Sequence, residues 1–484
     1  MKYIVAVDQS TSASKAFLVD EQGGIVRRAS RPHRQFYPAP GRVEQDAGEI
    51  FHNVEAIIAE VTEGIPTDQL AALALTNQRE TTVLWDRRTG EPACPAVVWQ
   101  DTRGEPLCEE LIRHDARVRD LTGSALSPYL PASKIGVLLR ENPALRRRAE
   151  AGELCMGTME SWLAFKLGGR HVTDASNASR TQLMDIHRLE WSKELTSLFG
   201  IPEGLLAEVL PCDGDFGSYC GMPIVGVLGD SFGTLFGQGC HAPGTAKISY
   251  GTGTSVMVNL GEHALIPENG LTTAVAWRFG GRTAYELEGN ITCSGDTLIW
   301  LCEGLELFRD PQEIEELART VPDALGVQLV PAMAGLGAPF FDTGATALIR
   351  GMTRGATRAH VARAALEAMA QRPADVLEAI RAGSGLEVPL LMADGGGCKN
   401  TLLMQFQADL ADCELQCARF SELSALGAAW MAGIAVGLFN SLEDIPARQG
   451  EGARYAPRMA VEQRKAMREA WRLAIQCARM RQED

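Results

Sequence analysis

The stretch VDQSTSASKAFLVD, residues 7–20, places carboxylate, amide, hydroxyl and amine side chains between two apolar runs. A tight β-hairpin needs only a two-residue turn, so this bend carries more hydrogen-bonding groups than its geometry requires. Hydroxyls and backbone N–H groups at a hairpin tip can bind phosphates, and a nearby carboxylate can hold Mg²⁺ through water. The stretch therefore predicts a phosphate-binding hairpin, with Asp8 near Mg²⁺ and Lys15 near a phosphate, or else a solvated polar turn.

Two further loops of this kind occur in the second half of the chain. AKISYGTGTSVMVNLG, residues 246–261, again has a strand, a turn rich in Gly, Thr and Ser, and a second strand. LLMADGGGCKN, residues 390–400, is an apolar strand that runs into three glycines, which permit close backbone approach to a ligand. No G-x-x-x-x-G-K-[ST] motif occurs, and no G-x-G-x-x-G follows a strand. Three donor-rich loops suit one nucleotide bound outside the P-loop and dinucleotide-binding folds.

The order of predicted elements divides the chain into two similar halves. The first half is predicted to contain a helix over 47–63 and strands at 3–7, 16–20, 25–28, 70–77, 82–86, 96–101 and 222–228. The second half repeats the strand, turn and strand pattern over 246–261 and places a helix over 401–411 after the triple glycine. We expect a duplicated α/β domain with a ligand between its halves, divided as 1–240, 241–450 and a C-terminal helical segment, 451–484.

Composition excludes several classes of protein. With 484 residues the chain is too long for one core, and its net charge of -15 argues against a broad nucleic-acid interface. The 12 cysteines form no paired C-x-x-C motif, which favours reduced thiols in the cytoplasm over a zinc site or a disulfide framework. The N-terminus lacks the apolar core of a signal peptide. The uncharged stretch 424–439 is shorter than the roughly 18 residues of a membrane span, so a buried helix and no membrane are expected.

Several other side chains suggest chemistry, each with a simpler alternative. In GVLGDSFGTLFGQG, Asp230 follows a strand and precedes a predicted helix, so it is either an N-cap residue or a general base. In NQRET, Arg79 and Glu80 form either a surface ion pair or a donor and acceptor pair for a polyol. Trp99 and Tyr129 either pack in a core or close over the carbon skeleton of such a ligand.

These motifs, in this order, resemble the FGGY carbohydrate kinases over nearly the whole chain, and most closely the glycerol kinases among them. The resemblance is carried by DQSTSASK, YPAPGRVEQD, LTNQRETTVLWDRRTGEP, VVWQDTR, VTDASNASRTQLMDI, VPAMAGLGAPFFD, DGGGCKNTLLMQFQADL and SALGAAWMAGIAVGLF. The stretch ALIRGMTRGATRAHVARAALE contains the family signature. So many motifs in one order make the resemblance highly specific.

The resemblance implies an actin-like ATPase fold, in which two ribonuclease H-like domains enclose an ATP cleft. It makes Asp230 the general base and Asp8 the residue near Mg²⁺. It implies polyol contacts from Arg79, Glu80, Trp99, Tyr129, Asp230 and the positions of Ser231 and Ser255. It implies ATP contacts from Thr11, Ser12, Lys15, Gly251, Thr252, Gly253, Gly295, Gly396, Gly397 and Asn400.

The sequence departs from the glycerol kinases at three positions of these motifs. Ser10 occupies a hairpin position where they usually carry Gly. Ser231 stands where they usually carry Gln, and Ser255 where they carry Phe. The last two changes shorten side chains around the polyol, so we expect a larger and more polar acceptor pocket.

The predicted function is ATP-dependent phosphorylation of a small polyol, first of all glycerol to glycerol 3-phosphate, by a cytoplasmic transferase that uses Mg²⁺. A tetritol or a pentulose is the alternative acceptor. A non-catalytic actin-like module that binds nucleotide is the alternative of another class, although such a module has no need of a base such as Asp230. We expect no nucleic-acid or membrane partner, and a homo-oligomer, either a dimer or a tetramer.

Overall fold

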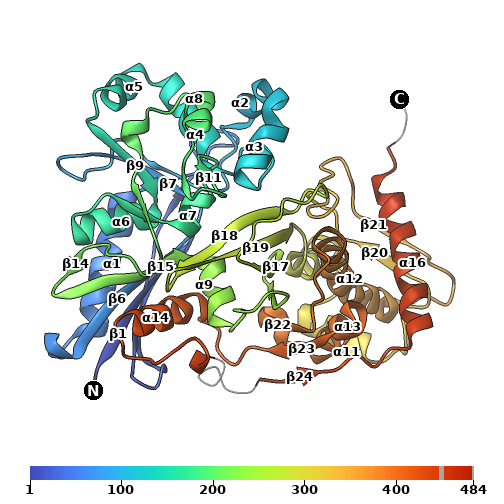
Figure 1. Ribbon diagram of the computed structural model, residues 1–484. Coiled ribbons are helices and arrows are strands. Elements are labelled where there is room, and N and C mark those ends of the chain that lie inside the picture. Colours follow the sequence, from blue (N-terminus) through green and yellow to red (C-terminus); the bar gives the residue numbers. More distant parts are fainter. Residues whose placement is uncertain (446–451, 482–484) are drawn as a thin grey trace.

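The computed structural model describes residues 1–445 and 452–481. Two large sheets form two lobes, and the N-terminus lies at the lower left of Figure 1. The N-terminal sheet has the strand order β14-β15-β6-β1-β2-β3. Its strands are β1 (Tyr3–Gln9), β2 (Ala13–Val19), β3 (Ile25–Pro32), β6 (Leu70–Asn77), β14 (Ser218–Tyr219) and β15 (Met222–Gly229).

The C-terminal sheet repeats this topology with one additional strand, in the order β18-β19-β17-β16-β22-β23-β24. Its strands are β16 (Ala246–Tyr250), β17 (Thr254–Gly261), β18 (Thr272–Phe279), β19 (Arg282–Ile291), β22 (Leu390–Gly395), β23 (Glu414–Cys417) and β24 (Arg454–Tyr455). Strand β1 pairs antiparallel with β2 and parallel with β6, as β16 pairs antiparallel with β17 and parallel with β22. The two halves therefore share one folding pattern, as the sequence predicts.

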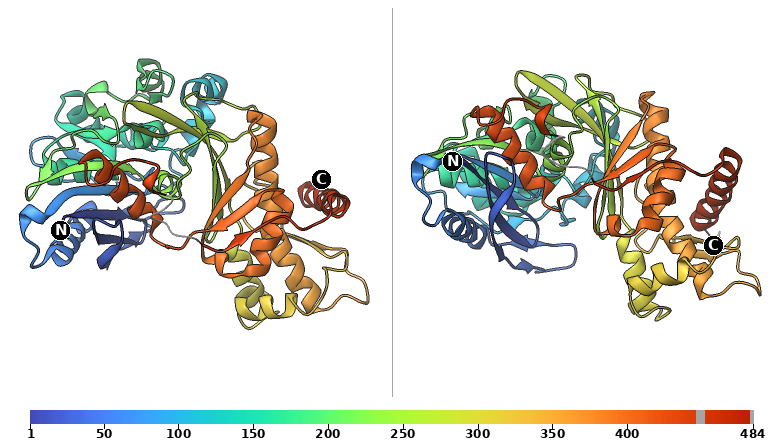
Figure 2. Two further views of the ribbon diagram at one scale, coloured as in Figure 1. Left: turned by 60° about the horizontal axis from the view of Figure 1, so that its bottom comes forward. Right: turned by 90° about the horizontal axis from the view of Figure 1, so that it is seen from below.

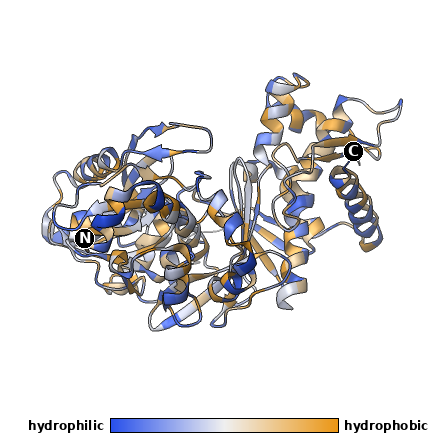
Figure 3. Cartoon of the chain, turned by 90° about the horizontal axis from the view of Figure 1, so that it is seen from above, coloured by the Kyte–Doolittle hydropathy of each residue, from blue (hydrophilic) through white to orange (hydrophobic). Residues whose placement is uncertain are grey.

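Helices cover both sheets. Helix α1 (Ala47–Thr62) is capped by Asp46, whose side chain accepts a hydrogen bond from Glu49 N, and the apolar face of the helix packs against the N-terminal sheet. Helices α12 (Arg358–Ser384) and α13 (Thr401–Ala411) contribute to the core of the C-terminal domain. Helix α16 (Val461–Arg479) buries Trp471 and Ile475 against that core and is largely hydrophilic elsewhere (Figure 3). The terminal helix expected from the sequence is thus amphipathic, with one buried face.

One helix from the second half of the chain packs on the first. Helix α14 (Leu423–Ala435) shares a core with α9 (Asp230–Gly237) and with residues of β1 and β6, and Figure 2 shows it among the elements of the N-terminal lobe. Small residues permit this contact, since a Cβ on Gly427 would lie 1.9 Å from Gly233 O. The predicted domain boundaries remain predictions, and the boundary between 450 and 451 lies outside the described residues.

The remaining elements extend the two lobes. The N-terminal lobe has a second sheet of β4 (Gln35–Phe36), β5 (Glu44–Gln45), β7 (Thr82–Asp86), β8 (Ala96–Val97) and β9 (Leu154–Thr158), and two strand pairs, β10 (Val172–Asp174) with β13 (Glu208–Leu210) and β11 (Met184–Asp185) with β12 (Glu190–Trp191). It also holds α2 (Glu105–Glu110), α3 (Asp115–Thr122), α4 (Pro131–Glu141), α5 (Pro143–Glu150), α6 (Met159–Gly168), α7 (Ala175–Ser179) and α8 (Lys193–Phe199). The C-terminal lobe adds α10 (Gly295–Ile299), α11 (Pro311–Ala318), β20 (Gln328–Val330) and β21 (Leu348–Arg350).

The structure corrects several predicted element bounds. The strands of the first hairpin run to Gln9 and restart at Ala13, so the bend is three residues long rather than eight. Ser10 closes it, because both its N–H and its hydroxyl donate to Ala13 O, at 3.0 and 2.8 Å. Only residues 96–97 of the predicted strand 96–101 are extended in a sheet, and α14 ends before the predicted helix end at 439. Among the described residues, no helix is both long and apolar enough to cross a membrane.

Candidate active site

Arg79 and Glu288 join the two domains at the centre of the molecule. Arg79 lies just after β6, and its Nη1 and Nη2 donate to the two carboxylate oxygens of Glu288 on β19, at 3.1 and 3.0 Å. Both side chains are buried. Burial opposes ionisation, but the charges of Arg79 and then Arg180 lower the pKa of Glu288 to about 2. The pair is therefore fully ionised, and Arg79 is no surface group.

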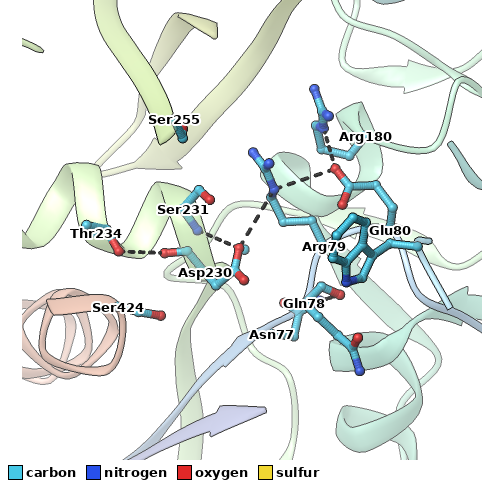
Figure 4. A network of polar contacts seen from close by, with 12 residues as sticks. Asn77, Gln78, Arg79, Glu80, Arg180, Asp230, Ser231, Thr234, Ser255 and Ser424 are labelled. Carbon is cyan, nitrogen blue, oxygen red and sulfur yellow. Dashed lines mark hydrogen bonds and ion pairs between the residues drawn. The ribbon is translucent and has the colours of Figure 1, made fainter. Parts of the chain in front are cut away.

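Glu80 faces a second arginine at the same junction. Arg180 Nε donates to Glu80 Oε1 at 2.8 Å, and Arg79 Nε lies 3.5 Å from the same oxygen. Arg180 Nη1 also lies 3.6 Å from Glu288 Oε2. Figure 4 shows Glu80 between the two arginines. The alternative of a surface ion pair for Arg79 and Glu80 is wrong, because both side chains are buried within a four-membered charge network.

Asp230 is the first residue of α9, and its carboxylate points toward Arg79 (Figure 4). The distance from Arg79 Nε to Asp230 Oδ1 is 3.7 Å, and the Asp230 side chain remains 35% exposed. Gly229, not Asp230, occupies the N-cap position of α9. Burial raises the pKa of Asp230, with Arg79 opposing and Glu80 adding to the shift. The carboxylate is thus an accessible base with raised proton affinity.

The first hairpin brings Asp8 and Lys15 opposite one another on β1 and β2. Asp8 is 7% exposed, and its Oδ1 has no hydrogen-bond partner among the described residues. Burial and then the charge of Asp230 raise the pKa of Asp8 to about 7. Lys15 Nζ lies 3.3 Å from Oε2 of Glu422, just before α14. The hairpin therefore presents a buried carboxyl beside a cation that already has a partner from the second half of the chain.

Thr11, Trp99 and Tyr129 lie together beside that hairpin. Trp99 Nε1 donates to Thr11 Oγ1 at 2.9 Å, and the Trp99 and Tyr129 rings lie 5.4 Å apart at 57°. Ser12, the other central residue of the turn, is exposed. The two aromatic side chains are only partly buried, which favours the ligand-facing alternative over a core role.

Ser231 and Ser255 approach the charge network from two elements. Ser231 N donates to Asp230 Oδ1 at 2.6 Å, and Ser255 Oγ on β17 donates to Glu288 Oε1 at 3.3 Å. In Figure 4 Ser231 lies next to Asp230, Ser255 stands on a separate strand, and Ser424 of α14 lies on the side of Asp230 away from Arg79. Ser231 thus adjoins the Asp230 carboxylate, and Ser255 adjoins the carboxylate of Glu288.

The second hairpin, between β16 and β17, forms a tight loop of glycines. Gly251 N donates to Gly253 O at 2.8 Å, and Gly295 N at the start of α10 donates to Gly251 O at 3.1 Å. Thr252 O accepts from Ser294 N at 3.1 Å. A Cβ on Gly295 would lie 2.5 Å from Gly251 O, so only glycine lets this helix start approach the hairpin.

Two neighbouring cavities open beside this hairpin. The first, of about 710 Å³, is lined by Gly251, Gly295, Gly396, Gly397, Asn400 and apolar side chains such as Leu298, Leu366 and Met369. The second, of about 810 Å³, shares Gly251 and Gly295 and is also lined by Thr252. Sites of this size hold small ligands and cofactors. Gly397 packs on the Tyr250 ring, and Asn400 caps α13 by accepting from Leu403 N at 2.9 Å.

Sequence reasoning missed four charged members of this site: Glu286, Glu288, Arg180 and Lys247. A signal for two of them exists in YELEGN, residues 285–290, where glutamates alternate with other residues and so share one strand face. The apolar cavity residues carry no such signal, because Leu and Met are also ordinary core residues. Among the described residues, no cluster of three or more His, Cys, Asp or Glu side chains is arranged to hold a metal ion.

Both halves of the chain match one known protein family. The N-terminal domain of the FGGY family of carbohydrate kinases matches residues 3–237, and the C-terminal domain of that family matches 246–436. A glycerol kinase of Alkalilimnicola ehrlichii is 46% identical, with 99% of this chain and 98% of the relative covered. A glycerol kinase of Deinococcus radiodurans is 42% identical, with coverage of 100% and 99%.

Solved structures show the same architecture. The Plasmodium falciparum glycerol kinase with ADP superimposes with a TM-score of 0.95 at 32% identity, covering 100% of this chain and 99% of that one. A ligand-bound xylulose kinase from Lactobacillus acidophilus has a TM-score of 0.89 at 20% identity, covering 99% and 98%, which shows a shared fold alone. The predicted actin-like ATPase fold is confirmed.

Proposed function

Because the chain belongs to the FGGY family of carbohydrate kinases, we propose that it transfers the γ-phosphoryl group of ATP to glycerol, forming glycerol 3-phosphate. Relatives that are 42–46% identical over almost the whole chain are glycerol kinases, and so is the structure with the TM-score of 0.95. A phosphoryl-transfer site needs an acceptor hydroxyl, a base and a phosphate-binding region in one place. The junction of the two domains supplies residues suited to all three.

The observation that carries the proposal is the position of Asp230. Its carboxylate lies at the start of α9, partly exposed and 3.7 Å from Arg79 Nε. A carboxylate whose pKa is raised is a stronger base, which favours removal of a proton from a hydroxyl. The guanidinium of Arg79 holds it by charge without a short hydrogen bond, so an oxygen of the carboxylate is free to accept the proton.

The reaction then proceeds in line. Asp230 takes the proton of the acceptor hydroxyl as that oxygen attacks the γ-phosphorus, the bond from phosphorus to the bridging oxygen breaks, and ADP leaves with the electron pair. Arg79 and Glu80 orient the polyol by donating to and accepting from its hydroxyls, and the Trp99 and Tyr129 rings cover its carbon atoms. Ser231 and Ser255 complete the acceptor site.

The nucleotide is proposed to span both hairpins. Thr11, Ser12 and Lys15 contact phosphates from the N-terminal domain, and Gly251, Thr252, Gly253 and Gly295 contact them from the C-terminal domain. Gly396, Gly397 and Asn400 hold the adenosine, in the cavity of about 710 Å³ that they line. The apolar side chains of that cavity suit the face of a purine ring.

The unpartnered, buried oxygen of Asp8 fits a role as the protein's contact to Mg²⁺. Mg²⁺ keeps most of its water and is commonly bound through one or two carboxylates together with substrate phosphates, so a single carboxylate suffices. When bound, the ion neutralises charge that develops on the phosphate oxygens. In this arrangement Asp8 positions the hydrated ion and does not exchange protons with the acceptor.

A coupled assay of ADP release with glycerol, tetritols, pentuloses and hexoses tests the proposal. The expected result is acceptor-dependent ADP release with glycerol, and ³¹P NMR should identify glycerol 3-phosphate as the product. Equal ADP release without an acceptor would make the protein an ATPase. Nucleotide binding without turnover on any acceptor would support the alternative of a non-catalytic actin-like module.

Three further properties stay predictions: a cytoplasmic location, a homo-oligomeric state, and the division of the chain into 1–240, 241–450 and 451–484. Size-exclusion chromatography with light scattering tests whether the chain is a dimer or a tetramer. Limited proteolysis followed by mass spectrometry tests the boundaries.

A further inference from the structure

A closed ring of hydrogen bonds links the tip of the first hairpin to the aromatic side of the proposed acceptor site. Gln45 Nε2 donates to Thr11 O at 2.6 Å, and Gln78 Nε2 donates to Gln45 Oε1 at 2.8 Å. Thr81 Oγ1 donates to Gln78 Oε1 at 2.9 Å and accepts from Trp99 N at 3.1 Å. Trp99 Nε1 closes the ring by donating to Thr11 Oγ1 at 2.9 Å. We call these residues the polar ring.

The three inner members of the polar ring are buried and fully hydrogen-bonded. Gln45 at the end of β5 and Thr81 before β7 are 0% exposed, and Gln78 after β6 is 1% exposed. Gln78 Nε2 also donates to Gln9 Oε1 at 3.2 Å, so every side-chain nitrogen and oxygen of the three residues takes part in a hydrogen bond.

Burial of these amides indicates a role beyond packing. Removing an amide from water costs free energy unless it is hydrogen-bonded, whereas apolar groups of the same shape fill such a space at little or no cost. A fully satisfied polar network is rigid and holds its members in one arrangement. The polar ring therefore fixes the positions of the two residues at its ends, Thr11 and Trp99.

Those two ends belong to different parts of the proposed site. Thr11 is the proposed contact to a phosphate, and Trp99 is the proposed cover of the acceptor's carbon atoms. Gln78 directly precedes Arg79, which is proposed to bind the acceptor. In-line transfer needs the attacking oxygen roughly 3–3.5 Å from phosphorus, and a misplacement of about 1 Å costs about 100-fold in rate. The polar ring joins the two groups whose relative position matters most.

We propose that Gln45, Gln78 and Thr81 are positioning residues, which hold Thr11 and Trp99 in one geometry and so align the γ-phosphoryl group with the acceptor hydroxyl. This inference rests on the proposed function. The three residues act through Thr11 and Trp99 rather than by contact with a substrate. Because the ring is closed, a break on the hairpin side also loosens Trp99, and a break beside Trp99 also loosens Thr11.

The competing explanation is that the buried amides only stabilise the N-terminal lobe. In that case each substitution lowers stability and changes at most the binding of the substrate nearest to it. The test therefore measures the effect of each break on the substrate at the opposite end.

Two substitutions break the polar ring on opposite sides. Gln45→Met removes the amide beside the hairpin, and Thr11 O keeps a second neighbour, since His33 Nε2 lies 2.9 Å from it. Thr81→Val removes the hydroxyl beside Trp99 and keeps the shape of the side chain. Gln371→Met is the matched control, because Gln371 is 2% exposed and its Oε1 accepts from Arg468 Nη1 at 2.6 Å in the C-terminal domain.

Calorimetric titration measures binding without the reaction. We expect Gln45→Met to weaken glycerol binding about fivefold and Thr81→Val to weaken binding of β,γ-imido-ATP about fivefold, the factor that corresponds to one hydrogen bond. Gln371→Met should leave both affinities unchanged, even where its midpoint of thermal unfolding falls as far as that of Gln45→Met.

Steady-state kinetics give a second readout. Each break should lower kcat for glycerol about tenfold or more, because the acceptor and the phosphoryl group lose their alignment. The variant with both substitutions should lose less than the product of the two single losses, since residues of one network are not additive. Gln371→Met should keep the wild-type kcat.

The outcomes separate this inference from the function on which it rests. Affinity changes confined to the substrate nearest each break, losses of kcat that multiply, or equal losses in Gln371→Met each overturn the polar ring and leave the proposed function in place. Should Gln45→Met fail to fold, the effect of Thr81→Val on nucleotide affinity decides alone. A wild-type protein that phosphorylates no acceptor overturns the proposed function itself.

Discussion

Arg79 donates two hydrogen bonds to the Glu288 carboxylate, at 3.1 and 3.0 Å, across 209 residues of sequence. Arg79 belongs to the N-terminal domain and Glu288 to a strand of the C-terminal sheet, so this pair fixes how the domains meet beside Asp230. Because both groups are buried, removal of either one deprives the other of its only hydrogen-bonded charge partner in the network. The orientation of the proposed acceptor site depends on this contact between domains.

Glu288→Gln should therefore destabilise the protein and weaken use of the acceptor. Breaking a buried ion pair by removal of one partner costs about 3–5 kcal/mol. We expect the midpoint of thermal unfolding to fall by several degrees and KM for glycerol to rise. Glu378→Gln, whose carboxylate is 41% exposed, should change the midpoint little. Equal effects of the two variants would contradict a special role for the Arg79 contact.

Asp230→Asn should lower kcat by about 100-fold or more, because an amide cannot take the hydroxyl proton. KM for the acceptor should stay similar, since an amide of the same shape retains contacts to the polyol. Steady-state kinetics measure both constants, and an unchanged midpoint of thermal unfolding checks that the variant is folded. A variant with wild-type kcat would show that another group removes the proton.

The double variant Ser231→Gln with Ser255→Phe should increase the preference for glycerol over longer acceptors. Longer side chains at these positions reduce the space and polarity of the acceptor site and cover more apolar surface of a three-carbon chain. The measurement is the ratio of kcat/KM values for glycerol and erythritol. An unchanged ratio would mean that neither serine borders the part of the site that selects acceptors.

The raised pKa of Asp8 predicts that the stability of the folded protein depends on pH. The pKa of Asp8 is raised from 3.8 to about 7 by burial and then by Asp230, so the folded protein holds this proton more tightly than the unfolded chain. The associated stability is fully present below about pH 4 and is lost as pH rises through about 7. By pH 8 the loss is up to about 4 kcal/mol.

Thermal unfolding of the Mg²⁺-free wild-type protein and Asp8→Asn between pH 4.5 and 8 measures this effect. The variant lacks the titrating group, so its stability relative to the wild type should increase with pH. Parallel curves for the two proteins across this range would refute the raised pKa.

Gly295→Ala should weaken nucleotide binding about tenfold or more, because a close backbone contact leaves no room for a methyl group. Its Cβ would lie 2.5 Å from Gly251 O and would displace the second hairpin. Gly204→Ala is the matched control, since nothing lies within 4 Å of its Cβ. Calorimetric titration measures the affinity of both variants for ADP. Equal ADP affinities of Gly295→Ala and Gly204→Ala would exclude this hairpin from the nucleotide site.

Local patterns predict the repeated part of the fold. Alternation of apolar and polar residues, with glycines at the turns, indicates both strand hairpins and the strand before the triple glycine, and the structure contains all three. The predictions of strand and turn bounds fail where a hydrogen bond or contact seen only in the folded structure sets the bound. The turn at Ser10 is tighter than its polar residues suggest, because Ser10 donates two hydrogen bonds to Ala13 O. Asp8 and Lys15 belong to the strands, where they are opposite residues of the ladder.

For the site, sequence identifies the residue types but not their partners. Arg79, Glu80 and Asp230 stand out as charges beside strand ends, but sequence alone leaves open a surface pair or polyol contacts for the first two and a helix cap or a general base for Asp230. The structure instead buries Arg79 and Glu80 among Arg180 and Glu288, which lie far along the chain. The alternating glutamates of YELEGN, residues 285–290, place Glu286 and Glu288 on one strand face but do not show that this face is buried.

The sequence by itself determined the duplicated α/β architecture, the two hairpins and the chemical types available for phosphoryl transfer, since these follow from periodicity and residue type over short windows. Only the tertiary structure decided which charges are paired, that Lys15 meets Glu422, and that Glu286 has no partner. Pairing and burial depend on distances between residues that are hundreds of positions apart. Those distances also set the pKa of Asp8 and of Asp230, and with it which carboxyl can act as a base.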